Sequence, residues 1–471
     1  MKILALESST SSAKALLYDT KTKKTTVKQR IYPKMSESVS LHDAETVLHE
    51  MLAAGKEVLA GQSDIEMIAL SGTWHSLCLC DEKMGAVTPA YPWTYTGASG
   101  ICRELREDKD YASDYYRRTG CMVNAIYPFF KLLLLQKQGY RLGDHRIASQ
   151  SIYNTYYLTD KCVVTQCMAS GSGLLNTHTL SYDEEVLRQL DVPEESMPEL
   201  VPYHQTFPLS KRAAAELGLK TGIPVIPANS DGGLNQIGAG ALRVGVMTFS
   251  VGTSGAIRLT TEKPILPQMQ GTWCYRSPKS WLSGAATSGA CNCIDWFKRK
   301  VGGGVSYQEL ETKELITDAP IFLPFVFGER CPGWNDTRRA SFEGLKESDT
   351  VKSLYQAVQE GVLFNLYQCY EALTDVNGHP EEIRLSGGIL NSEKWMQMCA
   401  DIFGREILID HEAQASLMGG AALAMELLGE LRQAEDFEVK TGGRLVPDLT
   451  KKQFYQERYG IYKDAYRRQI S

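Results

Sequence analysis

Apolar and polar residues alternate in short runs at the start of the chain. Residues 2–6 form an apolar strand, residues 14–19 alternate, and residues 25–31 continue beyond a polar turn, which predicts a β-meander. Residues 44–60 carry apolar side chains at a helical period, and residues 67–71 return to a strand-like run. Strands that alternate with helices in this way favour a mixed α/β sheet.

The second half of the chain repeats this organisation. Strand-like runs at residues 246–250 and 256–260 flank a tight turn, and residues 383–385 form a further strand. Helical patterns cover residues 351–373 and 393–403, the latter ending at a glycine that favours a helix stop. The two halves therefore predict two similar domains with a cleft between them.

Length and composition fit that division. At 471 residues, with 43% hydrophobic and 23% charged residues, the chain is too long for one compact core and is expected to form domains at residues 1–235 and 236–471. Fifty Lys+Arg against 56 Asp+Glu disfavour a general nucleic-acid binder, and no apolar run is long enough for a membrane span. Twelve cysteines without an export signal predict reduced thiols and a cytoplasmic location.

One acidic residue and one turn suggest phosphoryl transfer. Asp231 stands beside glycines, where a lone carboxylate can serve as a base. The turn Gly252-Thr253-Ser254-Gly255 follows a strand and can offer backbone N–H groups and hydroxyls to a phosphate. A base and a phosphate cradle so close in sequence favour a kinase-like reaction.

The same kind of turn occurs near the N-terminus. Thr10-Ser11-x-Ala13 matches Thr253-Ser254-x-Ala256 in register, and each turn joins two strands. No GxxxxGK[ST] motif occurs, so a Walker-type fold is disfavoured. The alternative is that both turns are ordinary hairpins.

A double glycine follows the strand at residues 383–385. Ser386-Gly387-Gly388 allows the backbone to approach a ligand closely before the next helix begins. A plain strand-to-helix turn is the alternative for this motif taken alone.

Several ordered motifs resemble those of the FGGY carbohydrate kinases, within the sugar kinase/actin/heat-shock chaperone ATPase superfamily. The resemblance runs from residue 1 to about residue 428. The matching segments are residues 7–14 (first phosphate motif), 72–75 (substrate loop), 252–255 (second phosphate loop), 323–332 (Leu-Pro-x-x-x-Gly-Glu-Arg-x-Pro), 342–345 (Phe-x-Gly-Leu) and 386–391 (adenosine loop).

The resemblance implies an α/β fold of two ribonuclease H-like (actin-like ATPase) domains, each with a mixed sheet, around an interdomain catalytic cleft. It implies an ATP-dependent kinase for a terminal hydroxyl of a sugar or sugar acid, with ATP and Mg²⁺ as cofactors. It assigns catalysis to Asp231, substrate binding to Trp74, His75 and Asp231, and the metal to Glu7 through water. The implied phosphate and ATP ligands are Ser9, Thr10, Ser11, Lys14, Gly252, Thr253, Ser254, Gly387, Gly388 and Asn391.

Some positions depart from the family pattern. Glu7 and Ser9 stand where the family has Asp and Gly, and Thr73 replaces Gln. The substrate-side Trp-x-Asp-x-Arg motif becomes Trp93-Thr94-Tyr95-Thr96-Gly97 and loses both charges. Ser230-Asp231-Gly232, His75-Ser76 and Trp334-Asn335 resemble the gluconate kinase branch more than the xylulose or glycerol kinase branches.

Other interpretations stay open at this point. The protein could be a catalytically impaired homologue that binds a nucleotide or sugar, or a kinase for another ketose or polyol such as xylulose. In isolation His75 would be a structural histidine and Trp74 a core residue, while Glu329 and Arg330 could form a structural ion pair near the cleft. The expected partner is a small sugar or sugar acid, with no nucleic acid and no membrane, and a homodimer is left open.

Overall fold

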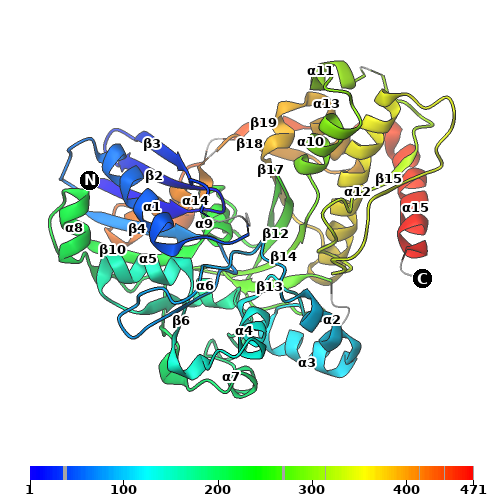
Figure 1. Cartoon of the computed structure of the whole chain (residues 1–471). Coiled ribbons are helices and arrows are strands. Elements are labelled where there is room, and N and C mark those ends of the chain that lie inside the picture. The colour runs from blue at the N-terminus through cyan, green and yellow to red at the C-terminus, as the bar shows by residue number, and fades with distance from the viewer. Residues whose placement is uncertain (36–39, 268–270, 313, 413, 440, 470–471) are drawn as a thin grey trace.

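Two α/β domains lie next to one another in the computed structural model of the chain (Figure 1). The structure describes the chain apart from residues 36–39, 268–270, 313, 413, 440 and 470–471. Each domain is built on a mixed sheet, as expected from the sequence.

The N-terminal sheet combines an antiparallel meander with parallel strands. Its strands run in the order β3 (Lys24–Ile31), β2 (Ser12–Asp19), β1 (Lys2–Ser8), β4 (Met67–Gly72), β10 (Pro224–Ser230) and β9 (Phe207–Pro208). β1, β4 and β10 are parallel, whereas β2, β3 and β9 pair antiparallel with their neighbours. The predicted β-meander is therefore confirmed.

The C-terminal sheet repeats this plan. Its order is β13 (Trp273–Arg276), β14 (Trp281–Thr287), β12 (Gly255–Thr261), β11 (Val246–Val251), β17 (Glu382–Ser386), β18 (Ile407–Asp410) and β19 (Thr441–Leu445). β11 and β12 form a hairpin, and β11 pairs in parallel with β17, just as β1 pairs with β2 and with β4. The repetition predicted from the strand pattern is thus real.

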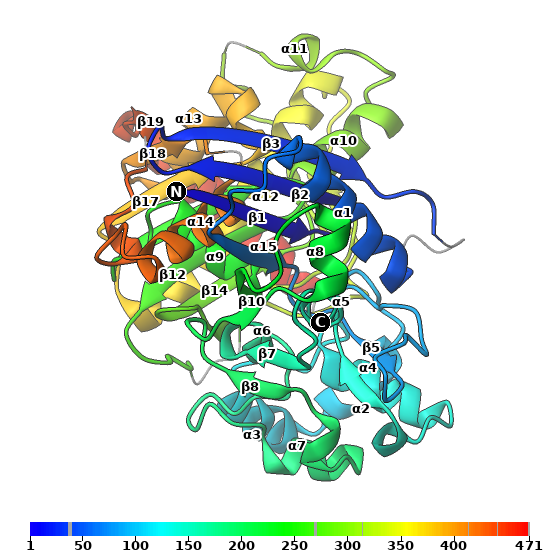
Figure 2. The ribbon, with the colours of Figure 1, turned by 90° about the vertical axis from the view of Figure 1, so that its left-hand side faces the viewer.

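Alternate residues of β1 face two different helical layers. Leu4 and Leu6 pack in the core that includes α1 (Ala44–Leu59), whereas Ile3 and Ala5 pack with α9 (Asp231–Gly238) and α14 (Ala415–Leu427). Figure 2 shows the strands of this sheet with α1 and α8 (Lys211–Leu217) beside them. β1 is therefore a central strand that is buried on both faces, whereas β3, at the edge of the sheet, is largely exposed.

α14 belongs to the second half of the sequence but packs on the N-terminal sheet. It can approach α9 closely because glycines face one another across the contact. A Cβ on Gly238 would lie 1.8 Å from the Ala415 carbonyl oxygen, and one on Gly419 would lie 2.0 Å from that of Leu234. The helix thereby carries Ser416 back to the edge of the N-terminal sheet.

The C-terminal sheet is covered by long helices. α12 (Val351–Asn377) and α13 (Glu393–Phe403) confirm the predicted helices, with α12 extending further than its pattern indicated. The last helix, α15 (Lys452–Arg468), is fixed through Arg458, whose Nε donates to Glu360 Oε2 at 2.7 Å. No helix among the described residues has the length and apolar character that a membrane span requires.

A buried lysine holds two loops together. Lys131 of α4 (Pro128–Lys137) is only 1% exposed, and its Nζ donates to the carbonyl oxygens of His75 (2.6 Å), Tyr91 (3.2 Å) and Pro92 (2.8 Å). Three acceptors require three N–H donors, which only the ammonium form supplies. Burial lowers the pKa of Lys131, while these oxygens favour its protonated state.

We predict that Lys131→Met lowers the free energy of unfolding by about 3 kcal/mol or more, since three buried carbonyls would lose their donor. Lys137→Met, on the exposed end of the same helix, is the matched control and should change it by less than about 0.5 kcal/mol. Urea unfolding followed by tryptophan fluorescence measures both. Equal midpoints for Lys131→Met and the wild type would contradict this role.

Candidate active site

The carboxyl ends of three parallel strands lie abreast at one edge of the N-terminal sheet. Ser8 of β1 pairs with Gly72 of β4, and Gly72 pairs with Ser230 of β10. Asp231 follows directly as the first residue of α9, and Ser230 caps that helix by accepting from the Gly233 N–H at 3.0 Å. This register brings the first turn, the loop after Gly72 and Asp231 to the same place.

The first predicted phosphate turn joins β1 to β2. Ser9 Oγ donates to the Ser12 carbonyl at 2.7 Å, so its side chain closes the turn. Lys14 of β2 pairs with Glu7 at 3.5 Å, across the hairpin. Thr10, at the tip, accepts a hydrogen bond of 2.8 Å from Trp93 Nε1.

Glu7 is buried at the end of β1, with 2% of its surface exposed. Its Oε2 accepts from Ser71 Oγ at 3.0 Å and also from Ser416 Oγ, and its Oε1 faces Lys14. The carboxylate is therefore oriented from three sides, one of them supplied by α14.

The second predicted turn and the double glycine lie against each other. Gly252, Thr253 and Ser254 link β11 to β12, and Gly387 follows β17, the parallel neighbour of β11. Gly387 has φ +98°, and a Cβ there would lie 2.6 Å from the Val251 carbonyl oxygen.

The double glycine leads into a short 3-10 helix, η3 (Gly388–Asn391). Asn391 ends that helix and donates to the Gly388 carbonyl at 3.1 Å. The residues predicted to face adenosine are thus brought together with the second turn.

A cavity of about 260 Å³ lies between the two domains. Of the predicted site residues, Thr10, Trp74, His75, Asp231 and Ser254 line it. The rest of its wall consists of Thr73, Trp93, Gly255, Ala256, Arg258, Trp273, Tyr275, Ala286 and Arg330. The other predicted residues, all within the described part of the chain, lie outside this lining; they are Glu7, Ser9, Ser11, Lys14, Gly252, Thr253, Gly387, Gly388 and Asn391.

The Trp74 indole forms one wall of this cavity and is clamped between two glycines. A Cβ on Gly171 or on Gly232 would come within 2.4 Å of the ring. Its Nε1 donates to the Cys167 carbonyl at 2.9 Å, and the Tyr275 ring centroid lies 5.0 Å away. The glycine after Asp231 is therefore needed for close packing beside the acid.

His75 has an unusual backbone and a neutral ring. Its φ is +69°, and its Nδ1 lies 2.5 Å from the Gly171 carbonyl oxygen, which places the ring proton on Nδ1 and leaves Nε2 as an acceptor. Burial lowers the pKa of His75 well below its ordinary value, and the charge of Arg330 lowers it further.

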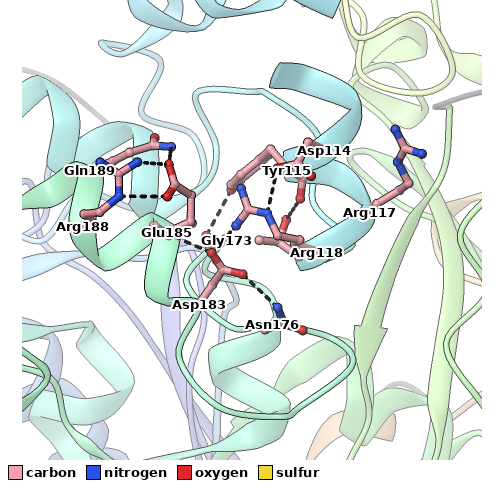
Figure 3. Close-up of polar contacts among 12 residues, drawn as sticks. Asp114, Tyr115, Arg117, Arg118, Gly173, Asn176, Asp183, Glu185, Arg188 and Gln189 are labelled. Atoms are coloured by element: carbon pink, nitrogen blue, oxygen red, sulfur yellow. Dashed lines mark hydrogen bonds and ion pairs between the residues drawn. The ribbon is translucent and has the colours of Figure 1, made fainter. Parts of the chain in front are cut away.

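Polar contacts fix the loop that contains the carbonyl partner of His75 (Figure 3). Arg118 of α3 (Lys109–Thr119) forms an ion pair with Asp183, and Asp183 accepts from Asn176 at 2.9 Å. Tyr115 OH, from the same helix, donates to the Gly173 carbonyl at 3.2 Å. The position of His75 thus depends on contacts well outside the cavity.

Asp231 has the electrostatic setting of a general base. Burial raises its pKa to about 6, and the negative charge of Glu7 adds to the increase, while Arg258 and the Gly232 N–H oppose it. Its Oδ1 accepts from that N–H at 2.7 Å. At neutral pH the carboxylate is ionised yet more basic than an ordinary aspartate.

The suggested Glu329–Arg330 ion pair is wrong. Glu329 is buried and forms an ion pair with Arg338 at 3.0 Å, and Tyr466 OH donates to it at 2.5 Å. Arg330 instead faces the cavity, with its guanidinium carbon 5.7 Å from the centre of the Trp93 ring. Neighbouring residues in this irregular segment point in different directions.

Sequence reasoning also missed Arg258. It lies on β12 two residues after Ala256, on the face that lines the cavity, while Ile257 points into the core. An arginine in an otherwise uncharged strand, directly after the second predicted phosphate turn, was the available signal.

The comparisons with known proteins agree on the family. The N-terminal domain model of the FGGY family of carbohydrate kinases matches residues 2–238, and the C-terminal domain model matches residues 247–427. A gluconokinase from Bacillus subtilis is 26% identical over 460 residues, covering 91% of this chain and 88% of that protein.

Solved structures give the same result. A gluconate kinase from Lactobacillus acidophilus has a TM-score of 0.92 at 26% identity, with 98% of this chain and 97% of that chain covered. A ligand-bound xylulose kinase from the same organism has a TM-score of 0.94 at 25% identity, with 100% and 98% covered. The two domain models match in order, and the two-domain fold is shared over nearly the whole length of the chain. This chain therefore belongs to the FGGY family of carbohydrate kinases.

Proposed function

We propose that the protein transfers the γ-phosphate of ATP to a terminal hydroxyl of a sugar acid of the gluconate type. The observation that carries this proposal is the cavity, in which Asp231 lies together with residues of both hairpin turns, Thr10 and Ser254. The gluconate kinases among the similar proteins support the sugar-acid class. The similarity to a xylulose kinase makes a ketose the second candidate.

In this mechanism Asp231 accepts the proton of the attacking hydroxyl as its oxygen bonds to the γ-phosphorus and the bond to ADP breaks. Positioning and charge neutralisation supply most of the catalysis in such transfers. The two turns would hold the phosphates through Ser9, Thr10, Ser11, Lys14, Gly252, Thr253 and Ser254, and Gly387, Gly388 and Asn391 would face the adenosine. Trp74 and His75 would line the sugar. Residues 1–235 and 236–471 would act as the two closing domains.

The residues present fit a Mg²⁺ ion that is held mainly by phosphates. The described residues contain no cluster of three or more acidic, histidine or cysteine side chains suited to a metal. Mg²⁺ in phosphoryl-transfer sites commonly uses one or two carboxylates together with waters and substrate phosphates. Glu7, oriented by Ser71 and Ser416, would supply such a carboxylate through water, and the ion would neutralise phosphate charge.

A cytoplasmic location forms part of this proposal. All twelve cysteines are unpaired, and most are buried in apolar surroundings. Free thiols are typical of a reducing compartment.

We expect Asp231→Asn to lower kcat by roughly 10²–10⁴-fold, because the amide cannot accept the proton. ATP should bind within a few-fold of the wild-type affinity, since the phosphate turns are unchanged. Coupled ADP release and calorimetric ATP titration measure the two effects, and the exposed Asp375→Asn is the control. Turnover retained by Asp231→Asn would remove the residue from its proposed role.

A substrate panel separates the candidate functions. With Mg-ATP, we expect ADP release to be fastest with gluconate and slower with xylulose, ribulose and glycerol. Fastest release with xylulose would favour the ketose candidate. No release with any of them, despite ATP binding, would identify an impaired homologue.

The pH dependence should follow Asp231. Because its pKa is raised to about 6, kcat/KM should be level above that pH and fall as pH drops below it, approaching tenfold per unit. Glu7→Gln removes one of the charges that raise the pKa of Asp231. The fall of kcat/KM on the acidic side of the pH profile should therefore move to lower pH, even if the variant is much slower than the wild type. An acidic fall that stays at the same pH or moves to higher pH would contradict the assignment of this pKa to Asp231.

A further inference from the structure

Two arginines line the cavity, and neither forms an ion pair with another described residue. Arg258 comes from β12, and Arg330 lies in the segment after β15 (Ile321–Leu323). The Nε atom of each is buried from solvent and has no hydrogen-bond partner among the described residues. Neither guanidinium forms an ion pair within that part of the chain.

Elsewhere the chain pairs its buried guanidinium groups with carboxylates. Arg338 lies 3.0 Å from Glu329, and Arg458 forms a hydrogen-bonded ion pair with Glu360. Such pairing is the usual rule, because an unpaired buried charge is costly. The two arginines of the cavity depart from this rule at the place where a substrate would supply the missing anion.

The charges of the cavity have different neighbours. Asp231 lies near Glu7, whose charge raises the pKa of Asp231. Arg330 lies beside Trp93 and close enough to His75 to lower its pKa, and it is not among the charges that shift the pKa of Asp231.

Arg258 is close enough to both Asp231 and Arg330 for their charges to affect its pKa. Burial lowers the pKa of Arg258, with Arg330 adding to that decrease and Asp231 opposing it. Asp231 is the only acidic residue among the described residues that line the cavity, so the wall carries more positive than negative charge.

Aromatic rings form part of the same cavity wall. Trp273 and Tyr275 stack with centroids 4.2 Å apart, and Trp74 lies 5.0 Å from Tyr275. Such a wall limits water around the guanidinium groups and strengthens their attraction for an anion. Arginine also matches the planar carboxylate with paired N–H donors.

We propose that Arg330, together with Arg258, forms the subsite for the carboxylate of a sugar acid. The carboxylate binds at the end of the cavity away from Asp231, and the terminal hydroxyl at the other end of the carbon chain faces Asp231. This inference rests on the proposed function and deepens it by naming the residues that select an acid over a neutral sugar.

The test compares D-gluconate with D-glucitol, which has the same carbon chain but a CH₂OH group in place of the carboxylate. Binding is followed by the fluorescence of the cavity tryptophans, which does not require turnover. We expect wild-type protein to bind gluconate more tightly than glucitol. Arg330→Gln and Arg258→Gln should each weaken gluconate binding by roughly 10- to 100-fold and leave glucitol binding within about threefold.

Two further variants sharpen the result. Arg330→Lys keeps the charge but loses the paired donors, so gluconate binding should fall to an intermediate level. The exposed Arg299→Gln is the matched control and should behave as the wild type. Three results would each overturn the subsite. Arg330→Gln could weaken the binding of both ligands equally, it could leave gluconate binding unchanged, or the wild-type protein could bind glucitol as tightly as gluconate.

Asp231→Asn separates this inference from the proposed function. The variant should still bind gluconate in preference to glucitol, because the carboxylate subsite is intact. The two hypotheses can also fail separately. If the wild type binds gluconate selectively, Arg330→Gln loses that selectivity and gluconate is not phosphorylated, the subsite is supported and the proposed kinase reaction is rejected.

Discussion

The parallel register of β1, β4 and β10 is the constraint on which the site depends. It places Ser8, Gly72 and Ser230 in one row, so that three segments far apart in sequence end side by side. A shift by one residue would turn the side chains of a strand to the opposite face of the sheet. The raised pKa of Asp231 follows from this row, because it sets the acid in a partly buried position near Glu7.

The second sheet supplies the opposite wall by repeating the same plan. Its hairpin β11–β12 presents Ser254 and Arg258 to the cavity, as β1–β2 presents Thr10. The domains meet through a hydrogen bond between the hydroxyls of Tyr127 and Tyr275 at 2.7 Å. A repeated fold thus yields two unlike walls, one with Asp231 and one with Arg258 and Arg330. Domain closure over substrates would exclude water from both.

Much of this arrangement could be predicted from sequence, because it depends on local patterns. The strand periods, the two serine and threonine turns and the helix Glu393–Phe403 are properties of short segments, and the structure confirms them. The carboxyl ends of parallel strands meet at one edge, so Asp231 could be expected near the turns. The boundary between residues 235 and 236, and the individual roles of the site residues, stay predictions.

What could not be predicted depends on distant contacts. Lys131 is the first residue of an apolar run, and the neighbouring sequence does not indicate that its ammonium group donates to three loop carbonyls. The partner of Glu329 is Arg338 rather than its neighbour Arg330, and this pairing depends on how an irregular segment turns. The packing of α14 on the N-terminal sheet, which brings Ser416 to Glu7, likewise depends on glycine contacts across the fold.

The most direct test of the account is a crystal structure with Mg²⁺, gluconate and a non-hydrolysable ATP analogue. The account predicts that the β- and γ-phosphates lie between the turns at Thr10 and Ser254. It also predicts that the terminal hydroxyl of the sugar acid lies about 2.6–3.2 Å from a carboxylate oxygen of Asp231. Phosphates bound away from either turn, or a hydroxyl out of reach of Asp231, would contradict it.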